Sequence, residues 1–226
     1  VLEYQFTVPE GLRYRDFVTR LSQHPAMIGK PVPDAQDWLS KMHSRWLHPE
    51  GLLFPSTYRF ASHNLPIDII EQAYLKQLQV LQSEWAQRAE NLPYKTPYEV
   101  LIMASIIEKE TGLASERPII AGVFVRRLQK GMKLQTDPTV IYGMGAKFNG
   151  NIRRSDLTED TPYNTYVHRG LPPTPIALPG RAAIYAALHP ADGLSLFFVA
   201  RGDGSHEFAN TYPEHLLNVR KYQLKH

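Results

Sequence analysis

One segment of this chain predicts its own structure almost residue by residue. Thr96-Pro97-Tyr98-Glu99 offers a hydroxyl for a helix N-cap, a proline for the first helical position and a carboxylate at the third. The apolar run 100–107 follows, and Gly112 is the expected left-handed C-cap. A helix that is apolar on nearly all sides belongs inside a core. We therefore expect a buried helix over 97–111, with the rest of the chain built around it.

Two carboxylates near the end of this helix are its unusual feature. Glu108 shares a face with Leu101, Ala104 and Ser105, so its carboxylate is expected at the edge of an apolar wall. Partial desolvation there, together with the helix dipole, raises the pKa of a carboxyl group toward the range of a general acid. The other interpretation is that Glu108 and Glu110 are ordinary charges at a helix end.

Composition narrows the classes of function. The 226 residues are 43% hydrophobic and 21% charged, which is typical of a globular protein. The absence of cysteine excludes disulfides, thiolate zinc sites and thiol nucleophiles. The net charge of +3 is scattered along the chain, so no nucleic acid partner is expected. No histidine pair has the spacing of a zinc helix and no glycine loop has a phosphate-binding context, so neither a metal nor a cofactor is expected.

The order of patterns indicates an α+β fold in two parts. The first part is a small module, 1–59. It consists of a strand near residues 2–8, a helix over 14–21 and a second helix from Asp34 onward. A connector rich in Pro, Gly and aromatic residues ends this module, and a long amphipathic helix over 68–89 bridges to a lobe over 60–226. That lobe adds a helix over 119–128 and a strand over 195–200. The expected core of the module is Phe6, Phe17, Leu21, Trp38 and Leu39.

Two polar loops of the larger lobe are candidates for a carbohydrate groove. The segment 133–139 is expected to be a strand that runs into an Asp-Pro turn, and 161–166 is a polar, aromatic loop. Tyrosine rings offer flat faces to sugars, and amide and hydroxyl groups pair with sugar hydroxyls. The alternative is that Asp137 and Asn164 only form turns. The candidate binding residues are Glu110, Gln135, Asp137, Tyr163, Asn164, Thr165 and Tyr166.

Five sequence motifs, taken in their order along the chain, carry a resemblance to a known protein family. They are Ala104-Ser105-Ile106-Ile107-Glu108-Lys109-Glu110, Leu134-Gln135-Thr136-Asp137-Pro138-Thr139, Pro162-Tyr163-Asn164-Thr165-Tyr166, Gly170-Leu171-Pro172-Pro173-Thr174-Pro175-Ile176 and His206-Glu207-Phe208. In this order the chain resembles the YceG-like family of endolytic murein transglycosylases, from about Glu50 to the end. The proline-rich fourth motif is expected to form a rigid wall.

The resemblance implies a fold, a reaction and a location. It implies a LysM-like accessory module at 1–59 and a catalytic lobe at 60–226 in which Glu108 is the catalytic acid. The implied reaction cleaves the β-1,4 MurNAc–GlcNAc bond inside peptidoglycan strands and forms 1,6-anhydro ends, which would terminate growing strands. The family also implies an N-terminal membrane anchor, a bacterial inner membrane with this domain in the periplasm, and peptidoglycan synthases as partners. No run of about 18 apolar residues occurs in this chain.

A function from another class stays open beside the enzyme. The LysM-like start also fits a non-catalytic scaffold that binds peptidoglycan within the synthesis machinery. The two functions differ in whether soluble glycan fragments are released. Hydrolytic glycosidases use a second carboxyl group as nucleophile or base, and Glu110 and Asp137 are the candidates for it if the reaction is hydrolysis.

Overall fold

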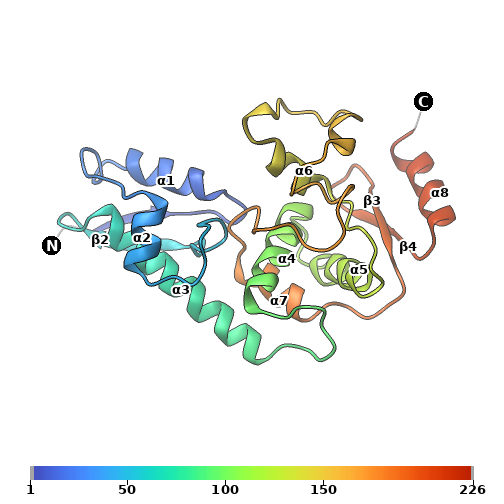
Figure 1. The fold of residues 1–226 in the computed structure, drawn as a ribbon, viewed down its shortest axis with the longest axis horizontal. Helices are drawn as coiled ribbons and strands as arrows, with labels where there is room; N and C mark the ends of the chain where they lie inside the picture. The colour runs from blue at the N-terminus through green and yellow to red at the C-terminus, as the bar shows by residue number, and fades with distance from the viewer. Residues whose placement is uncertain (1–2, 225–226) are drawn as a thin grey trace.

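The computed structural model describes residues 3–224 and confirms the α+β class. Two small antiparallel sheets lie among helices (Figure 1). In chain order the elements are β1 (Glu3–Thr7), α1 (Tyr14–Gln23), α2 (Ala35–Lys41), β2 (Thr57–Ala61), α3 (Pro66–Ala86), α4 (Pro97–Glu110), α5 (Arg117–Gln129), α6 (Asp137–Met144), the 3-10 turns Gly145–Lys147 and Asp156–Thr158, α7 (Arg181–Leu188), β3 (Phe197–Ala200), β4 (His206–Ala209) and α8 (Tyr212–Tyr222).

Helix α4 is the centre of the larger part of the molecule, as its sequence predicts. Every residue from Val100 to Ile107 is buried, and the helix contacts α3, α5, α6 and α7 (Figure 1). The Thr96 hydroxyl caps the start by accepting from the Glu99 N–H. The Glu99 carboxylate accepts from the N–H of Lys95 and so completes the cap one residue earlier than expected. Propensity, capping and burial all favour one position for this helix.

The end of α4 differs from the prediction. The helix stops at Glu110, Thr111 is extended with φ −144° and ψ 138°, and Gly112 is not among the residues with positive φ. The reason is local, because the Thr111 hydroxyl accepts from the Leu113 N–H at 3.0 Å. A side-chain turn therefore ends the helix where a left-handed glycine was expected. After the helix ends, the chain continues through residues 111–116 into α5.

The N-terminal elements form the strand and helix unit that was expected, and its predicted core residues are all buried. Strand β1 pairs with β2, with Glu3 opposite Ala61 and Thr7 opposite Thr57. The predicted boundary at 59 therefore falls inside β2. The hydrophobic cluster continues without a break from Phe6 to Leu188. The division into an accessory module and a catalytic domain stays a prediction.

The proline-rich segment 170–180 packs against the core as an irregular wall, and most of its residues from Thr174 to Gly180 are buried. The Ser105 hydroxyl, buried in α4, accepts from the Ile176 N–H at 2.9 Å. Leu178 exchanges two backbone hydrogen bonds with Gly11 and Leu12, at 2.9 and 2.7 Å. These contacts fix the wall between α4 and the loop that follows β1. The serine next to the glutamates of α4 is thus a structural residue.

The prediction of a strand over 133–139 is wrong. Residues 133–136 pair with no strand among the described residues, and Asp137 begins helix α6. Pro138 suits the first turn of a helix because it has no N–H to satisfy there. The Thr139 hydroxyl donates to the Thr136 carbonyl at 2.8 Å. The Asp-Pro pair therefore starts a helix and does not form an isolated turn.

Candidate active site

A cavity of about 400 Å³ opens where α4 ends. Its walls come from the end of α4, from α5, from the segment leading into α6, from the 161–166 loop and from the C-terminal strands and helix. It contains four of the residues singled out in the sequence, namely Glu110, Gln135, Asp137 and Tyr166. Other lining residues are Arg127, Leu134, Thr136, Phe197, Phe198, Val199, Ala200, His206, Tyr212, His215, Val219 and Gln223. Aromatic and polar side chains thus surround one carboxylate of α4.

That carboxylate belongs to Glu110, the last residue of α4. The Thr136 hydroxyl donates a hydrogen bond to Glu110 Oε1. Burial, which is the largest cause, and the neighbouring Asp137 raise the pKa of Glu110, whereas Thr136 and His206 lower it, and the net pKa is about 7. A carboxyl group with a pKa near 7 is protonated for a large fraction of the time near neutrality, yet can ionise. Glu110 thus has the properties of a general acid that also serves as a base.

The segment before α6 presents its side chains to the cavity by alternation. Leu134 and Thr136 are buried, whereas Gln135 and Asp137 are exposed. Gln135 has a positive φ of 52°, which is uncommon for a residue with a side chain and costs on the order of 1 kcal/mol. Tyr166 donates to Asp137 Oδ1 at 2.6 Å. This pair fixes a carboxylate and an aromatic ring beside Glu110.

Glu108 lies elsewhere. Its Oε2 accepts from the N–H of Gly180 at 2.9 Å, and it is not among the side chains that line the cavity. Burial raises the pKa of Glu108 and the Gly180 N–H opposes this effect. Two residues along a helix correspond to a rotation of about 200°, so Glu108 and Glu110 leave α4 on opposite sides. The contact of Glu108 is with the proline-rich wall.

The other three predicted binding residues stabilise the loop behind the cavity wall. The Asn164 amide donates to the carbonyls of Asp156 and Glu159 and accepts from the Tyr166 N–H, as in an Asx turn. Thr165 is buried, and its hydroxyl accepts from the Thr136 N–H at 3.0 Å. Tyr163 shares a hydrogen bond with Thr174 of the wall, at 2.8 Å. These contacts position Thr136 and Tyr166, and a direct role for the three in binding stays a prediction.

Arg127 organises the cavity, and sequence reasoning missed it. Its buried guanidinium donates to the carbonyls of Lys133, Leu134 and Leu196 at 2.6–3.0 Å. It also contacts Gln135 Oε1 at 3.3 Å and lies over the ring of Phe197. In the sequence it is one of two adjacent arginines in an apolar helix and looks like surface charge. Its acceptors are backbone carbonyls, two of them just after α5 and one 69 residues away, and no motif reveals these contacts.

A pH dependence of stability follows from the environment of Glu110. Its pKa is about 7 in the folded chain and ordinary in the unfolded chain, so the unfolded state loses its proton first as the pH rises from about 4.5 to 7. The contribution of Glu110 to the free energy of unfolding is therefore fully present below a pH of about 4.5 and is lost as the pH rises to about 7. Glu110→Gln should therefore raise the thermal midpoint at pH 8 and leave it nearly unchanged at pH 4.5. Calorimetry at the two pH values measures this, and an equal change at both would contradict it.

Within residues 3–224 the structure presents no cluster of three or more His, Asp or Glu side chains arranged to hold a metal ion. No helix in the same range is both long enough and apolar enough to cross a bilayer.

Several known proteins are similar to this chain over most of its length. The model of the YceG-like family matches residues 1–221. The endolytic murein transglycosylase of Bacillus subtilis (strain 168) is 40% identical over 180 residues, which are 77% of this chain and 48% of that protein. The endolytic murein transglycosylase of Streptococcus pneumoniae serotype 2 (strain D39) is 32% identical over 76% of this chain and 32% of its own length. The chain thus spans less than half the length of these relatives.

A solved structure agrees in fold. The crystal structure of a yceG-like protein from Listeria monocytogenes superimposes on this chain with a TM-score of 0.78 at 30% sequence identity. The match covers 94% of this chain and 75% of the Listeria chain. The match extends over both the N-terminal strand and helix unit and the region around α4. Together with the family model, which covers nearly the whole chain, this similarity shows that the chain belongs to the YceG-like family.

Proposed function

We propose that this chain is an endolytic lytic transglycosylase that cuts peptidoglycan glycan strands with Glu110 as its single catalytic acid and base. The observation that carries the proposal is the position of Glu110, at a helix end inside a cavity lined by polar and aromatic groups. Supporting it, the two relatives named above are called endolytic murein transglycosylases. The acid predicted from the sequence was Glu108, and the geometry favours Glu110 in its place.

In the first step, protonated Glu110 gives its proton to the glycosidic oxygen between N-acetylmuramic acid and N-acetylglucosamine. The C1–O bond breaks with the electron pair leaving on that oxygen. The sugar left behind carries positive charge on C1 and its ring oxygen. The Asp137 carboxylate, held by Tyr166, lies in the same cavity and can stabilise this charge.

In the second step, Glu110 is a carboxylate and takes the proton from the C6 hydroxyl of the muramyl sugar as its oxygen bonds to C1. A 1,6-anhydro ring closes, Glu110 is protonated again and no water is consumed. Thr136 remains hydrogen-bonded to Glu110 through both steps and favours the carboxylate form. One carboxyl group with a pKa near 7 suits both proton transfers.

Glu108 receives a structural role in this proposal. By accepting from the Gly180 N–H it holds the end of the proline-rich wall against α4. The wall in turn contacts the 161–166 loop through Thr174 and Tyr163. Loss of the Glu108 carboxylate should therefore affect the site only through the position of that loop.

The scaffold alternative is tested with purified peptidoglycan sacculi. The wild-type chain should bind sacculi and release soluble glycan fragments in proportion to time and enzyme. A heat-inactivated sample and Glu110→Gln are the controls for release, and co-sedimentation measures binding. Binding without release above the heat-inactivated sample would favour the non-catalytic scaffold and contradict the proposed activity.

The proposed substrate indicates where this part of the protein acts. Peptidoglycan lies outside the cytoplasmic membrane, so we propose that this part of the protein acts there. An anchor in the inner membrane and contact with peptidoglycan synthases remain predictions from the family resemblance.

A further inference from the structure

His206 lies in the cavity wall opposite the end of α4. It is the first residue of β4 and pairs across the hairpin with Ala200. Its side chain is 10% exposed and lines the same cavity as Glu110. The mechanism above does not use it. A histidine withdrawn from solvent beside the acid can change the charge that the acid experiences.

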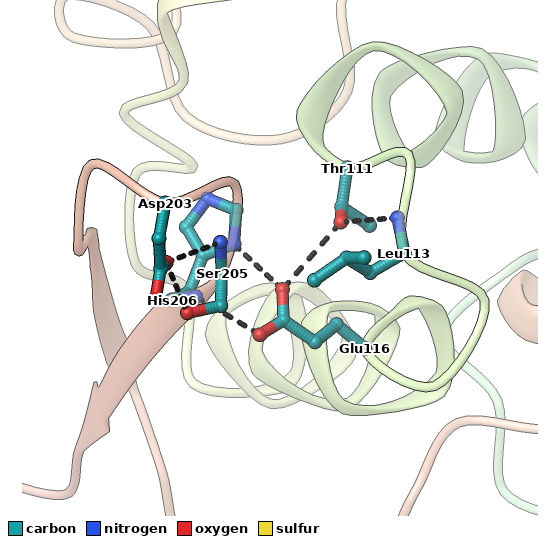
Figure 2. Close-up of polar contacts among 6 residues, drawn as sticks. All are labelled: Thr111, Leu113, Glu116, Asp203, Ser205 and His206. Carbon is teal, nitrogen blue, oxygen red and sulfur yellow. Dashed lines mark hydrogen bonds and ion pairs between the residues drawn. The ribbon is translucent and has the colours of Figure 1, made fainter.

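Glu116, the residue that precedes α5, holds His206 at two points (Figure 2). Its Oε1 accepts from the backbone N–H of His206 at 2.9 Å, and its Oε2 lies 2.8 Å from ring atom Nδ1. A carboxylate only accepts hydrogen bonds, so Nδ1 carries a proton and Nε2 is the ring's remaining polar atom. The Glu116 side chain is 11% exposed, so this contact is largely withdrawn from solvent.

The same carboxylate reaches back to the residue after the acid. The Thr111 hydroxyl lies 3.5 Å from Glu116 Oε2, so one network joins the end of α4, the start of α5 and the start of β4 (Figure 2). Thr111 follows Glu110 directly and its extended backbone ends the helix. The network therefore couples the position of the His206 ring to the position of Glu110.

We propose that His206, anchored by Glu116, is a positioning residue that stabilises the carboxylate form of Glu110 between the two proton transfers. This inference rests on the proposed role of Glu110. A positive charge on His206 lowers the pKa of Glu110, against burial and against Asp137, which raise it. Other ionisable groups that line the cavity are Arg127 of α5, Tyr166 of the loop after α6, and Tyr212 and His215 of α8.

The test is a direct titration of Glu110 by carbon NMR with glutamate labelled at the side-chain carboxyl. The Glu110 signal is assigned as the one that disappears in Glu110→Gln. In His206→Gln the pKa of Glu110 should rise by roughly half to one unit, because a cation near a carboxylate favours its charged form. Glu116→Gln should give a smaller rise, since the ring loses its anchor. The double variant should resemble His206→Gln, because the two residues act through one ring.

Glu207→Gln is the matched control. It removes a carboxylate from the next residue of β4, where Glu207 contacts Arg201 and Tyr222, and it should leave the titration of Glu110 unchanged. Circular dichroism checks that each variant is folded, and Glu116→Gln keeps the test decisive if His206→Gln does not fold. An unchanged Glu110 titration in folded His206→Gln or Glu116→Gln would overturn the inference.

Activity separates this inference from the proposed function. If Glu110 is the acid, the alkaline limb of the pH profile in His206→Gln should move upward together with the NMR titration. The rate at the optimum should fall about tenfold. If the titration moves but Glu110→Gln still cuts glycan, the network is as inferred and the catalytic assignment of Glu110 is wrong.

Discussion

Replacement of Glu110 by glutamine is expected to lower kcat/KM for glycan cleavage by a factor of about 10³. The amide keeps the shape and can still accept from Thr136, but it cannot donate a proton and take one back. General acid and base catalysis by one group is typically worth 10² to 10⁴ in rate. Fragment release from purified strands, followed by chromatography at constant enzyme concentration, measures the loss.

Glu108→Gln is the matched control for this result. It makes the same chemical change two residues away on the same helix, at a carboxylate that contacts the Gly180 N–H outside the cavity. A loss of less than tenfold is expected. If Glu108→Gln abolished cleavage and Glu110→Gln did not, the roles of the two residues would be reversed, as the family resemblance predicted.

The second large effect is expected at Gly51, far from the cavity. Gly51 has a φ of +78°, and a Cβ atom there would lie 2.5 Å from Cβ of Pro175 and 2.6 Å from its Cγ. A proline ring in a buried wall cannot rotate away. Gly51→Ala therefore combines backbone strain with a clash and should lower the free energy of unfolding by about 3 kcal/mol. Denaturant titration of the purified variant measures this change.

Gly29→Ala separates the two causes. Gly29 has nearly the same φ, +79°, and a Cβ atom there would have nothing within 4 Å. This variant should lose only about 1 kcal/mol, the cost of the left-handed backbone alone. Equal losses at Gly51 and Gly29 would show that the contact between the connector and the proline-rich wall contributes nothing.

The elements that could be predicted are those whose information is local. The start of α4 is determined by Thr96 and Pro97, and its burial by an unbroken apolar run. The strand over 195–200 and the helices over 14–21 and 119–128 have clear periodicity and are confirmed, with ends shifted by a few residues. The gathering of Gln135, Asp137 and Tyr166 was expected from their residue types alone.

What could not be predicted depends on contacts between distant residues. Thr111 ends α4 through a turn with Leu113, and the same hydroxyl contacts Glu116, which in turn holds His206 from the far end of the sequence. Arg127 donates hydrogen bonds to the backbone carbonyls of Lys133 and Leu196, and the spacing of residues along the chain does not reveal these contacts. The apolar residues on its own helix face singled out Glu108 for desolvation, whereas Glu110 is the carboxylate that lines the cavity. Which of the two enters a cavity depends on what packs against each side of α4.

The most direct test of the account is the chemical nature of the new glycan ends. Purified glycan strands are cut by the wild-type chain and the products are analysed by mass spectrometry in ordinary water and in water labelled with ¹⁸O. The account predicts 1,6-anhydro muramyl ends with no incorporated label, because the C6 hydroxyl takes the place of water. Reducing ends that carry ¹⁸O would contradict it, since they require hydrolysis with a second carboxylate such as Asp137 beside Glu110.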